Sequence, residues 1–373
     1  MLVIFGTRPE AIKLCPLVSA LREQPFCRAL QTVVCSTGQH REMLSQALKI
    51  FGIQPDLELD VMRQNQPLPE LTSRLMSALP PVFAEVQPAI SIVQGDTTST
   101  LCGALCSFYA AVDVAHVEAG LRTFNLRAPF PEEINRVLTS RLARLHFAAT
   151  HGAAGNLIKE GVPASAITVT GNTGIDAVLS IRDRLRGGTD SGLTLALDNR
   201  KKLIVVTAHR RENFGPDFEA ICSAISQLAG RDDVQIVWPV HRNPNVSRPA
   251  EAMLLGKPNV LLIEPLEYLP FVDLMQRAYF LLTDSGGIQE EAPSLGKPVL
   301  VLRTVTERPE AVEAGTVKLV GTDQTKIVAE TVNLLDDPQE YERMGRLHNP
   351  YGDGHACARI AERLFSHVET ALT

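Results

Sequence analysis

Three acidic segments in the first half of the sequence carry side chains capable of acid–base chemistry. Asp96 lies in GDTTST, Glu118 in HVEAGLRT and Glu132 in PEEINR. The first two follow stretches typical of buried strands, and open α/β sheets bind ligands at the carboxyl ends of their strands. Acidic side chains that converge on one sheet edge permit a general acid and a general base that face one sugar ring, and a glycosidase needs the same pair. An ordinary helix N-cap is the alternative for Asp96.

The segment GTRPE at residues 6–10, with Lys13 a turn later, has the pattern of an anion site. A glycine turn that leads into a helix presents free N–H groups and the positive end of the helix dipole to an anion. Arg8 and Lys13 add positive charge. A tight turn with solvated charges explains the segment equally well. The glycine spacing of a Walker loop or of a dinucleotide fingerprint is missing.

Three segments of the second half also favour anion recognition. His209 lies in TAHRREN and His241 in HRNP, so two His-Arg pairs follow successive predicted strands. Phosphate or pyrophosphate binding is the natural use of such pairs. In TDSGGIQEE, residues 285–287 open a helix whose N-terminus can hold a diphosphate, and Glu291 can bond ribose hydroxyls. A simple turn remains the alternative for the glycine pair.

Short apolar runs alternate with stretches of helical periodicity from end to end, which predicts an α/β fold. The first sheet is expected from strands at residues 2–5, 31–35, 89–94, 113–117, 145–149 and 167–170. The second is expected from residues 203–207, 235–240, 260–263, 280–283, 298–302 and 317–320. A polar stretch at 186–199 separates them. We predict two Rossmann-like doubly wound domains facing a cleft, over residues 1–170 and 171–354, with a C-terminal helix over 355–373 that can join the first domain.

Composition excludes several classes of protein. The 373 residues are 45% hydrophobic and 21% charged, which is ordinary for a globular chain, and the net charge of -6 argues against nucleic acid as a partner. No apolar run is long enough to span a bilayer, and the N-terminus lacks a secretory pattern, so a cytoplasmic protein is expected. The seven cysteines form no CxxC pair, and no metal site is predicted.

These motifs together resemble the UDP-N-acetylglucosamine 2-epimerase family. The matching segments, in order, are FGTRPEAIK (5–13), TGQHREML (37–44), GDT (95–97), HVEAGLRT (116–123), PEE-NR (131–136), TAHRREN (207–213), TDSGGIQEEAPSLGKP (283–298) and TERPEA (306–311). The resemblance implies the glycosyltransferase-B arrangement of two Rossmann-like domains. UDP is then held mainly by the C-terminal domain, and the sugar faces the N-terminal domain.

The resemblance also implies roles for individual residues. The implied catalytic residues are Asp96, Glu118, Glu132 and His209, with Glu132 preferred over Glu133 by resemblance alone. The implied ligands of UDP are Arg8, Lys13, Phe271, Ser285, Gly286, Gly287, Glu291 and Arg308. The family removes the C2 proton with loss of UDP to give 2-acetamidoglucal, and then adds UDP back with the opposite C2 configuration. No metal or nicotinamide cofactor is expected.

Non-hydrolysing members of the family resemble one another in binding a second UDP-N-acetylglucosamine as an activator. The candidates for that site are Gln39, His40, Gln66, Arg210 and His241, and Asn65 stands where some relatives carry Arg. The expected partners are UDP-N-acetylglucosamine and UDP-N-acetylmannosamine, and a homodimer is expected by resemblance. The alternatives are a 2-epimerase for UDP-2,3-diacetamido-glucuronate, a hydrolysing epimerase that releases N-acetylmannosamine, and a non-catalytic sensor of UDP-sugars.

Overall fold

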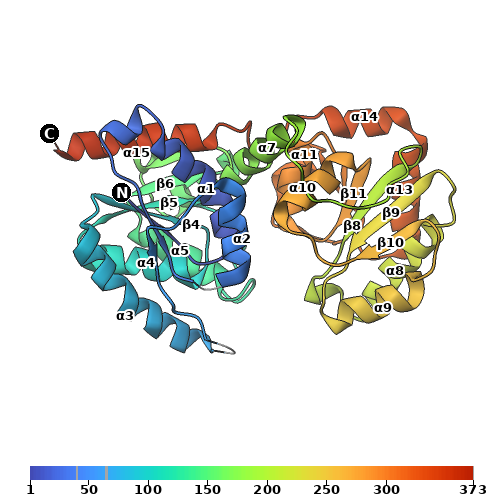
Figure 1. Cartoon of the computed structure of the whole chain (residues 1–373), viewed down its shortest axis with the longest axis horizontal. Helices are drawn as coiled ribbons and strands as arrows, with labels where there is room; N and C mark the ends of the chain where they lie inside the picture. The colour runs from blue at the N-terminus through green and yellow to red at the C-terminus, as the bar shows by residue number, and fades with distance from the viewer. Residues whose placement is uncertain (39–40, 64–65, 373) are drawn as a thin grey trace. The chain divides into compact units, whose positions relative to one another are not determined.

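The computed structural model describes residues 1–38, 41–63 and 66–372, and the chain divides into two compact units. Unit 1 comprises Met1–Ala177 and Tyr351–Thr373, and unit 2 comprises Val178–Pro350. The chain therefore passes between the units twice, first within helix α7 (Thr173–Arg186) and then between residues 350 and 351. Each unit contains one parallel sheet covered by helices, and the predicted fold class is confirmed (Figure 1).

The sheet of unit 1 has seven parallel strands in the order β3-β2-β1-β4-β5-β6-β7. They are β1 (Leu2–Phe5), β2 (Val33–Ser36), β3 (Leu57–Glu58), β4 (Ile90–Gln94), β5 (Asp113–Val117), β6 (Leu145–Ala148) and β7 (Ile167–Val169). The strand order reverses between β1 and β4, which is the switch point where doubly wound sheets bind ligands. Strand β3 was not predicted, because two residues are too short to produce an apolar run.

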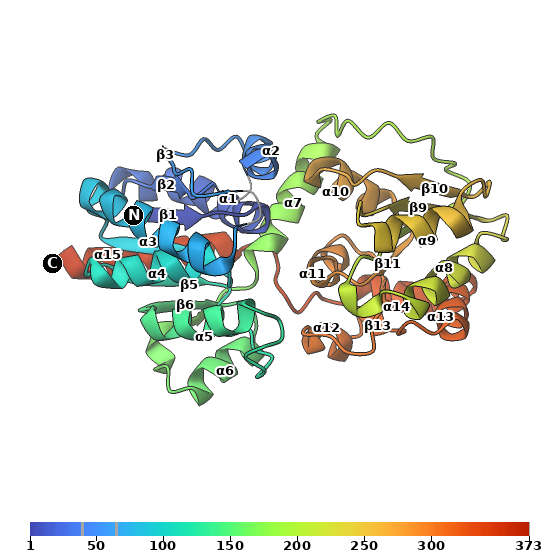
Figure 2. The same cartoon turned by 90° about the horizontal axis from the view of Figure 1, so that it is seen from below.

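Helices cover both faces of this sheet. They are α1 (Arg8–Arg22), α2 (Arg41–Phe51), α3 (Leu68–Val86), α4 (Thr98–Tyr109), α5 (Glu132–Leu142), α6 (His151–Lys159) and α15 (Ala356–Leu372). Helix α15 packs against α1 on one face, while α3 and α4 pack together on the other (Figure 1). Strand β3 and helix α2 lie at one end of the unit and α6 at the opposite end (Figure 2). The strands read as continuous apolar runs because helices bury both of their faces.

The sheet of unit 2 has six parallel strands in the order β10-β9-β8-β11-β12-β13. They are β8 (Lys202–Thr207), β9 (Val234–Pro239), β10 (Val260–Ile263), β11 (Phe280–Thr283), β12 (Val299–Val301) and β13 (Val317–Leu319). The switch point of this sheet lies between β8 and β11. All six strands predicted for the second sheet are therefore present. Two have the predicted ends, and the ends of the other four differ by one residue.

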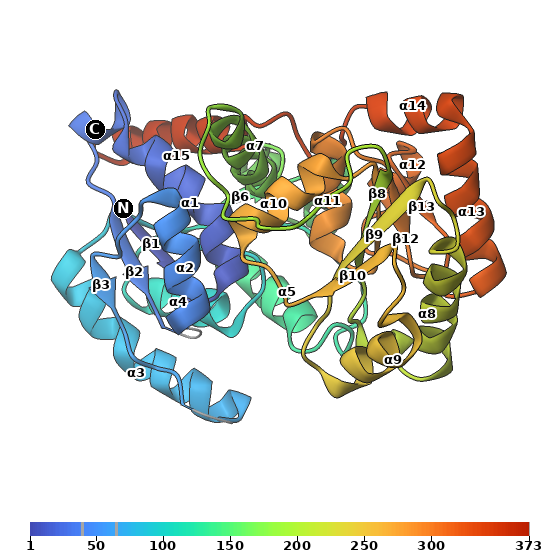
Figure 3. The ribbon, with the colours of Figure 1, turned by 45° about the vertical axis from the view of Figure 1, so that its right-hand side comes forward.

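The helices of unit 2 also form two layers. They are α8 (Pro216–Leu228), α9 (Pro244–Leu254), α10 (Tyr268–Arg277), α11 (Gly286–Ser294), α12 (Pro309–Glu313), α13 (Gln324–Asp336) and α14 (Pro338–Arg346). Helices α10 and α11 lie on one side of the sheet, and α8, α9 and α13 lie on the other (Figure 3). The hydrophobic core between the sheet and α8, α9 and α13 includes the fully buried Trp238 of β9, which packs against Phe218 of α8.

Candidate active site

Glu118 directly follows strand β5 and is held by three elements of unit 1. Lys13 of α1 places its Nζ 2.7 Å from both carboxylate oxygens. The buried amide of Gln94, the last residue of β4, donates to Oε2, and Asn172 after β7 donates to Oε1 at 3.4 Å. The backbone of Glu118 has a φ of 62°, in the left-handed region, so the extended conformation ends at this residue. Glu118 is thus a fixed carboxylate at the switch-point edge.

Asp96 lies in the neighbouring loop between β4 and α4. The Arg136 guanidinium of α5 bonds its Oδ2 at 2.5 Å, and Asn135 donates to its backbone oxygen at 2.9 Å. Burial raises the pKa of Asp96 above its ordinary value, the charge of Arg136 opposes this, and the charge of Glu118 adds to it. Two coupled carboxylates with different cationic partners, Lys13 and Arg136, therefore stand at one sheet edge.

The two adjacent acids at the start of α5 have different environments. Glu132 is half-buried, and within the described part of the chain its side chain has no hydrogen-bond partner. Glu133 is fully buried and accepts hydrogen bonds from the backbone N–H groups of Thr123 and Phe124, at 3.0 and 2.9 Å. It also lies 3.3 Å from Arg136. Glu133 thus anchors the loop before α5, whereas Glu132 has no such structural task.

Glu10 was not singled out by the sequence, although it joins the two loops of the switch point. Its side chain is 1% exposed, and Oε2 accepts from the N–H groups of Gly6 and Thr7 at 3.0 and 2.7 Å. Oε1 accepts from the hydroxyls of Thr97 and Thr100 at 2.7 and 3.1 Å. The loop after β1, which leads into α1 at Arg8, is thereby tied to the loop after β4, which carries Asp96. Burial raises the pKa of Glu10.

At the equivalent edge of unit 2, His209 follows β8 and stands between two other side chains. Its ring stacks on that of His241, with centroids 5.6 Å apart and planes 13° apart. Asp284, which follows β11, lies with Oδ1 3.5 Å from Nδ1. Burial lowers the pKa of His209, the Asp284 charge opposes this, and His241 and Arg210 add to the lowering. The ring is 44% exposed and can reach a ligand.

The start of helix α11 forms the second part of this edge. Ser285 is the N-cap residue, so the first N–H groups of α11 have no acceptor within the helix. A side chain at Gly286 would lie 3.0 Å from the Arg308 guanidinium, so the glycine leaves room for this group. Arg308 itself bonds Glu290 of α11 at 2.8 Å. Arg308 and the helix N-terminus thus lie close together, and such an arrangement can bind an anion.

The remaining predicted residues of unit 2 lie on the neighbouring elements. Phe271 is half-buried on α10, and Gly287 and Glu291 are on α11. Arg210 lies 3.5 Å from Glu307, whose carboxylate is also bonded by the buried Arg303 at 2.7 Å. Burial acts to raise the pKa of Glu307, but hydrogen bonds and charge from Arg303 outweigh it and hold this pKa at about 2. The guanidinium of Arg210 is therefore kept beside an anion of its own chain.

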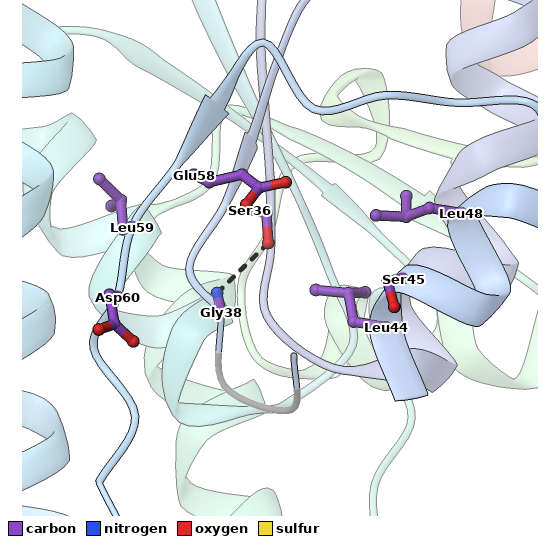
Figure 4. A pocket seen from close by; sticks show the side chains of 8 residues that line it. All are labelled: Ser36, Gly38, Leu44, Ser45, Leu48, Glu58, Leu59 and Asp60. Carbon is purple, nitrogen blue, oxygen red and sulfur yellow. Dashed lines mark hydrogen bonds between the residues drawn. The ribbon is translucent and has the colours of Figure 1, made fainter. Parts of the chain in front are cut away.

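A separate pocket of about 220 Å³ lies at the carboxyl end of β2, between α2 and the segment after β3. Figure 4 shows Leu44 and Leu48 on one side and Glu58, Leu59 and Asp60 on the other. Gly38 is required here, because a side chain would meet the Leu59 oxygen at 2.3 Å. The activator candidates Gln39 and His40, like Asn65, lie outside the described residues. Gln66 accepts from the N–H of Arg63 at 2.9 Å.

Metal-binding and membrane-spanning features were searched in the described ranges. Over residues 1–38, 41–63 and 66–372, no group of three or more His, Cys, Asp or Glu side chains has the geometry of a metal site. Over the same ranges, no helix combines the length and the apolar character needed to cross a bilayer.

Two parallel, doubly wound units in one chain define a glycosyltransferase-B-like protein with two Rossmann-like domains. Residues 20–365 match the family of UDP-N-acetylglucosamine 2-epimerases. The chain is 55% identical to the UDP-N-acetylglucosamine 2-epimerase of Escherichia coli, over 98% of both chains. The crystal structure of the Neisseria meningitidis enzyme bound to UDP-GlcNAc superposes with a TM-score of 0.90 at 46% identity, over 98% of this chain and 99% of that one.

A more distant relative has the same architecture. The Methanocaldococcus jannaschii UDP-GlcNAc 2-epimerase, in complex with UDP-GlcNAc and UDP, is 32% identical with a TM-score of 0.81, over 98% and 99% of the two chains. Identity of this extent over the full length is decisive for family membership. The chain belongs to the UDP-N-acetylglucosamine 2-epimerase family.

Proposed function

We propose that this protein interconverts UDP-N-acetylglucosamine and UDP-N-acetylmannosamine by inverting C2 of the sugar without net hydrolysis, as an isomerase. The observation that carries the proposal is the pair of carboxylates at neighbouring strand ends of unit 1, Glu118 with Lys13 and Asp96 with Arg136. Inversion at a carbon needs a proton taken from one face and another delivered to the opposite face. Two carboxylates that have different cationic partners suit these roles.

The chemistry begins with transfer of the C2 proton to one carboxylate. The electrons of the C2–H bond form the C1=C2 double bond, the C1–O bond breaks, and its electrons leave with the β-phosphate of UDP, giving 2-acetamidoglucal. In the second half, a UDP oxygen adds back to C1 while a protonated carboxyl group on the other face delivers its proton to C2. Asp96, Glu118 and Glu132 are the proposed acid and base groups. No oxidant or reductant is consumed.

UDP is the leaving group, and unit 2 is proposed to bind most of it. Arg308 and the α11 N-terminus at Ser285, Gly286 and Gly287 neutralise the diphosphate, and His209 stabilises the charge that develops as C1–O breaks. The other proposed ligands of UDP are Arg8, Lys13, Phe271 for the uracil, and Glu291 for the ribose. The proposed activator site for a second UDP-N-acetylglucosamine takes Gln39, His40, Gln66, Arg210 and His241.

We further propose that the protein is a cytoplasmic homodimer. Its seven cysteines are all free, which is typical of a reducing compartment. Phe108 and Tyr109 at the end of α4 are 60% and 71% exposed, and Leu138 of α5 is 43% exposed. Exposed apolar side chains of this size suit an interface between subunits. Light scattering of the purified protein tests the stoichiometry.

The decisive experiment is proton NMR of the purified protein with UDP-N-acetylglucosamine in D2O, without added metal or nicotinamide. The proposal expects UDP-N-acetylmannosamine to appear with deuterium at C2 in both epimers. Free N-acetylmannosamine together with UDP identifies a hydrolysing enzyme instead. An unchanged spectrum rejects this substrate, and UDP-2,3-diacetamido-glucuronate is then tested in the same way; binding without turnover of either indicates a sensor.

A further inference from the structure

The carboxylate of Asp284 is fully buried and its two oxygens have different tasks. Oδ2 accepts hydrogen bonds from the backbone N–H groups of His209 and Arg210, both at 2.8 Å, and from the Asn213 amide at 3.3 Å. These bonds fasten the loop after β8 to the loop after β11. Oδ1 is also buried but has no hydrogen-bond partner among the described residues. Oδ2 of Asp284 therefore holds two loops together, whereas Oδ1 has no hydrogen bond among the described residues.

The unused oxygen faces the ring of His209. Oδ1 lies 3.5 Å from Nδ1, slightly beyond hydrogen-bond distance, so a small rotation of the ring is enough to form the bond. A buried acceptor left without a donor costs free energy, which favours the tautomer with the proton on Nδ1. The ring of His241 stacks on the face of the His209 ring. With Nδ1 held by Asp284, Nε2 is the nitrogen available to a ligand.

We propose that Asp284 is a positioning residue that holds the His209 imidazole with its proton on Nδ1 and stabilises its protonated form, so that Nε2–H donates to the departing diphosphate. This inference rests on the proposed function, which makes His209 a ligand of that leaving group. Three charged or titratable groups act on His209: Asp284 favours its cation, while Arg210 and His241 oppose it. Asp284 is the only one of these three that favours the form needed to donate two protons.

The test uses Asp284→Asn in the full-length protein. The asparagine carbonyl can still accept from the N–H groups of His209 and Arg210, but an NH2 group replaces Oδ1 and cannot accept a proton. NMR titration of protein with 13C-labelled histidine reads the pKa of His209, whose signal is the one missing in His209→Gln. The pKa is expected to fall by about one unit. The kcat for epimerisation is expected to fall about tenfold, most steeply at alkaline pH, with KM changed less than about threefold.

Asp273→Asn is the matched control. Asp273 is a buried acid of unit 2 whose ion pair is with Arg277, so its loss should leave the pKa of His209 and the pH profile unchanged. A purely structural role for Asp284 predicts the same unchanged pKa in Asp284→Asn, and that result overturns the inference. The inference is also overturned if 15N shifts of neutral His209 in the wild type show the proton on Nε2. This measurement needs no variant.

The pKa of His209 and its 15N shifts can both be measured without turnover. If the wild-type protein is inactive on UDP-N-acetylglucosamine, the proposed function is rejected, and these two measurements still decide the role of Asp284.

Discussion

The two sheets share the same order over six strands, to which unit 1 adds β7, but the units differ in the charge of the side chains that follow their strands. In unit 1 the edge carries Asp96 and Glu118, each paired with a cation of the same unit. In unit 2 it carries His209, Arg308 and the N-terminus of α11. The fold supplies the same kind of edge twice, and the residue types placed there suit proton transfer in one unit and anion binding in the other.

In each unit a buried carboxylate joins the two loops at the switch point by hydrogen bonds. The two units differ in how many of its oxygens take part. Glu10 uses both of its oxygens to join the loops after β1 and β4. Asp284 joins the loops after β8 and β11 with one oxygen and leaves the other near His209. Glu10 therefore has both oxygens in hydrogen bonds that join loops, whereas Asp284 has one such oxygen and a second one next to a residue with a proposed chemical role.

The largest effect is expected for Glu118→Gln, which tests whether unit 1 serves proton transfer and unit 2 serves UDP binding. Glutamine cannot act as acid or base, so epimerisation and C2 deuterium exchange should fall by about 10²- to 10⁴-fold. UDP affinity, measured by calorimetry, should change by less than about twofold if unit 2 provides most of the binding free energy. Glu85→Gln, at an exposed position of α3 in the same unit, is the control. A large loss of UDP affinity in Glu118→Gln contradicts the division between the units.

The reciprocal change in unit 2 is Arg308→Gln. Glutamine can still donate to Glu290 but carries no positive charge, so UDP should bind about 10- to 100-fold more weakly, as expected when a charged hydrogen bond is lost. Calorimetric titration with UDP measures the effect. Arg346→Gln, which removes a cation that is 78% exposed on α14, should leave the affinity unchanged. If wild type and Arg308→Gln bind UDP with equal affinity, Arg308 is not a ligand of UDP.

Arg136→Gln tests how unit 1 sets the acidity of its carboxylates. The pKa of Asp96 is raised mainly by burial, and Arg136 opposes that rise, so loss of the cation should raise the pKa further, by about one unit. The limb of the kcat/KM pH profile that Asp96 controls should move to higher pH by the same amount. Arg141→Gln, on the same helix but bonded to the backbone of Glu160, is the control. If neither limb of the pH profile moves, Asp96 does not control the pH dependence of the reaction.

The smallest expected effect concerns stability alone. Glu10→Ala removes the acceptor of the Gly6 and Thr7 N–H groups and of the Thr97 hydroxyl, so the free energy of unfolding should fall by about 1 to 3 kcal/mol at pH 5. The pKa of Glu10 is raised in the folded state, so its stabilisation is greatest below its unfolded pKa and decreases as pH rises through the folded pKa. The difference between wild type and variant should therefore shrink from pH 5 to pH 8. Urea unfolding measures it, with the exposed Glu23→Ala as the control.

The sequence was sufficient to predict most of the fold because strand signals are local. Residues 90–94 and 203–207 are apolar runs with turn signals beside them, and both form central strands of their sheets. The edge strand β3 had no such signal. Similarly, the spacing of Asp96, Glu118 and His209 after apolar runs was enough to predict their position at strand ends, where the structure places them.

The partners of these residues were decided by tertiary structure. Lys13 and Glu118 are 105 residues apart, and Asp96 and Arg136 are 40 apart, so no local pattern links them. Lys13 was predicted only as a ligand of phosphate, and its bond to Glu118 depends on β1 and β5 both flanking β4. The sequence by itself determined which residue types stand at the strand ends. Strand order and register decided which of them meet, because pairing in a parallel sheet joins segments without regard to their separation along the chain.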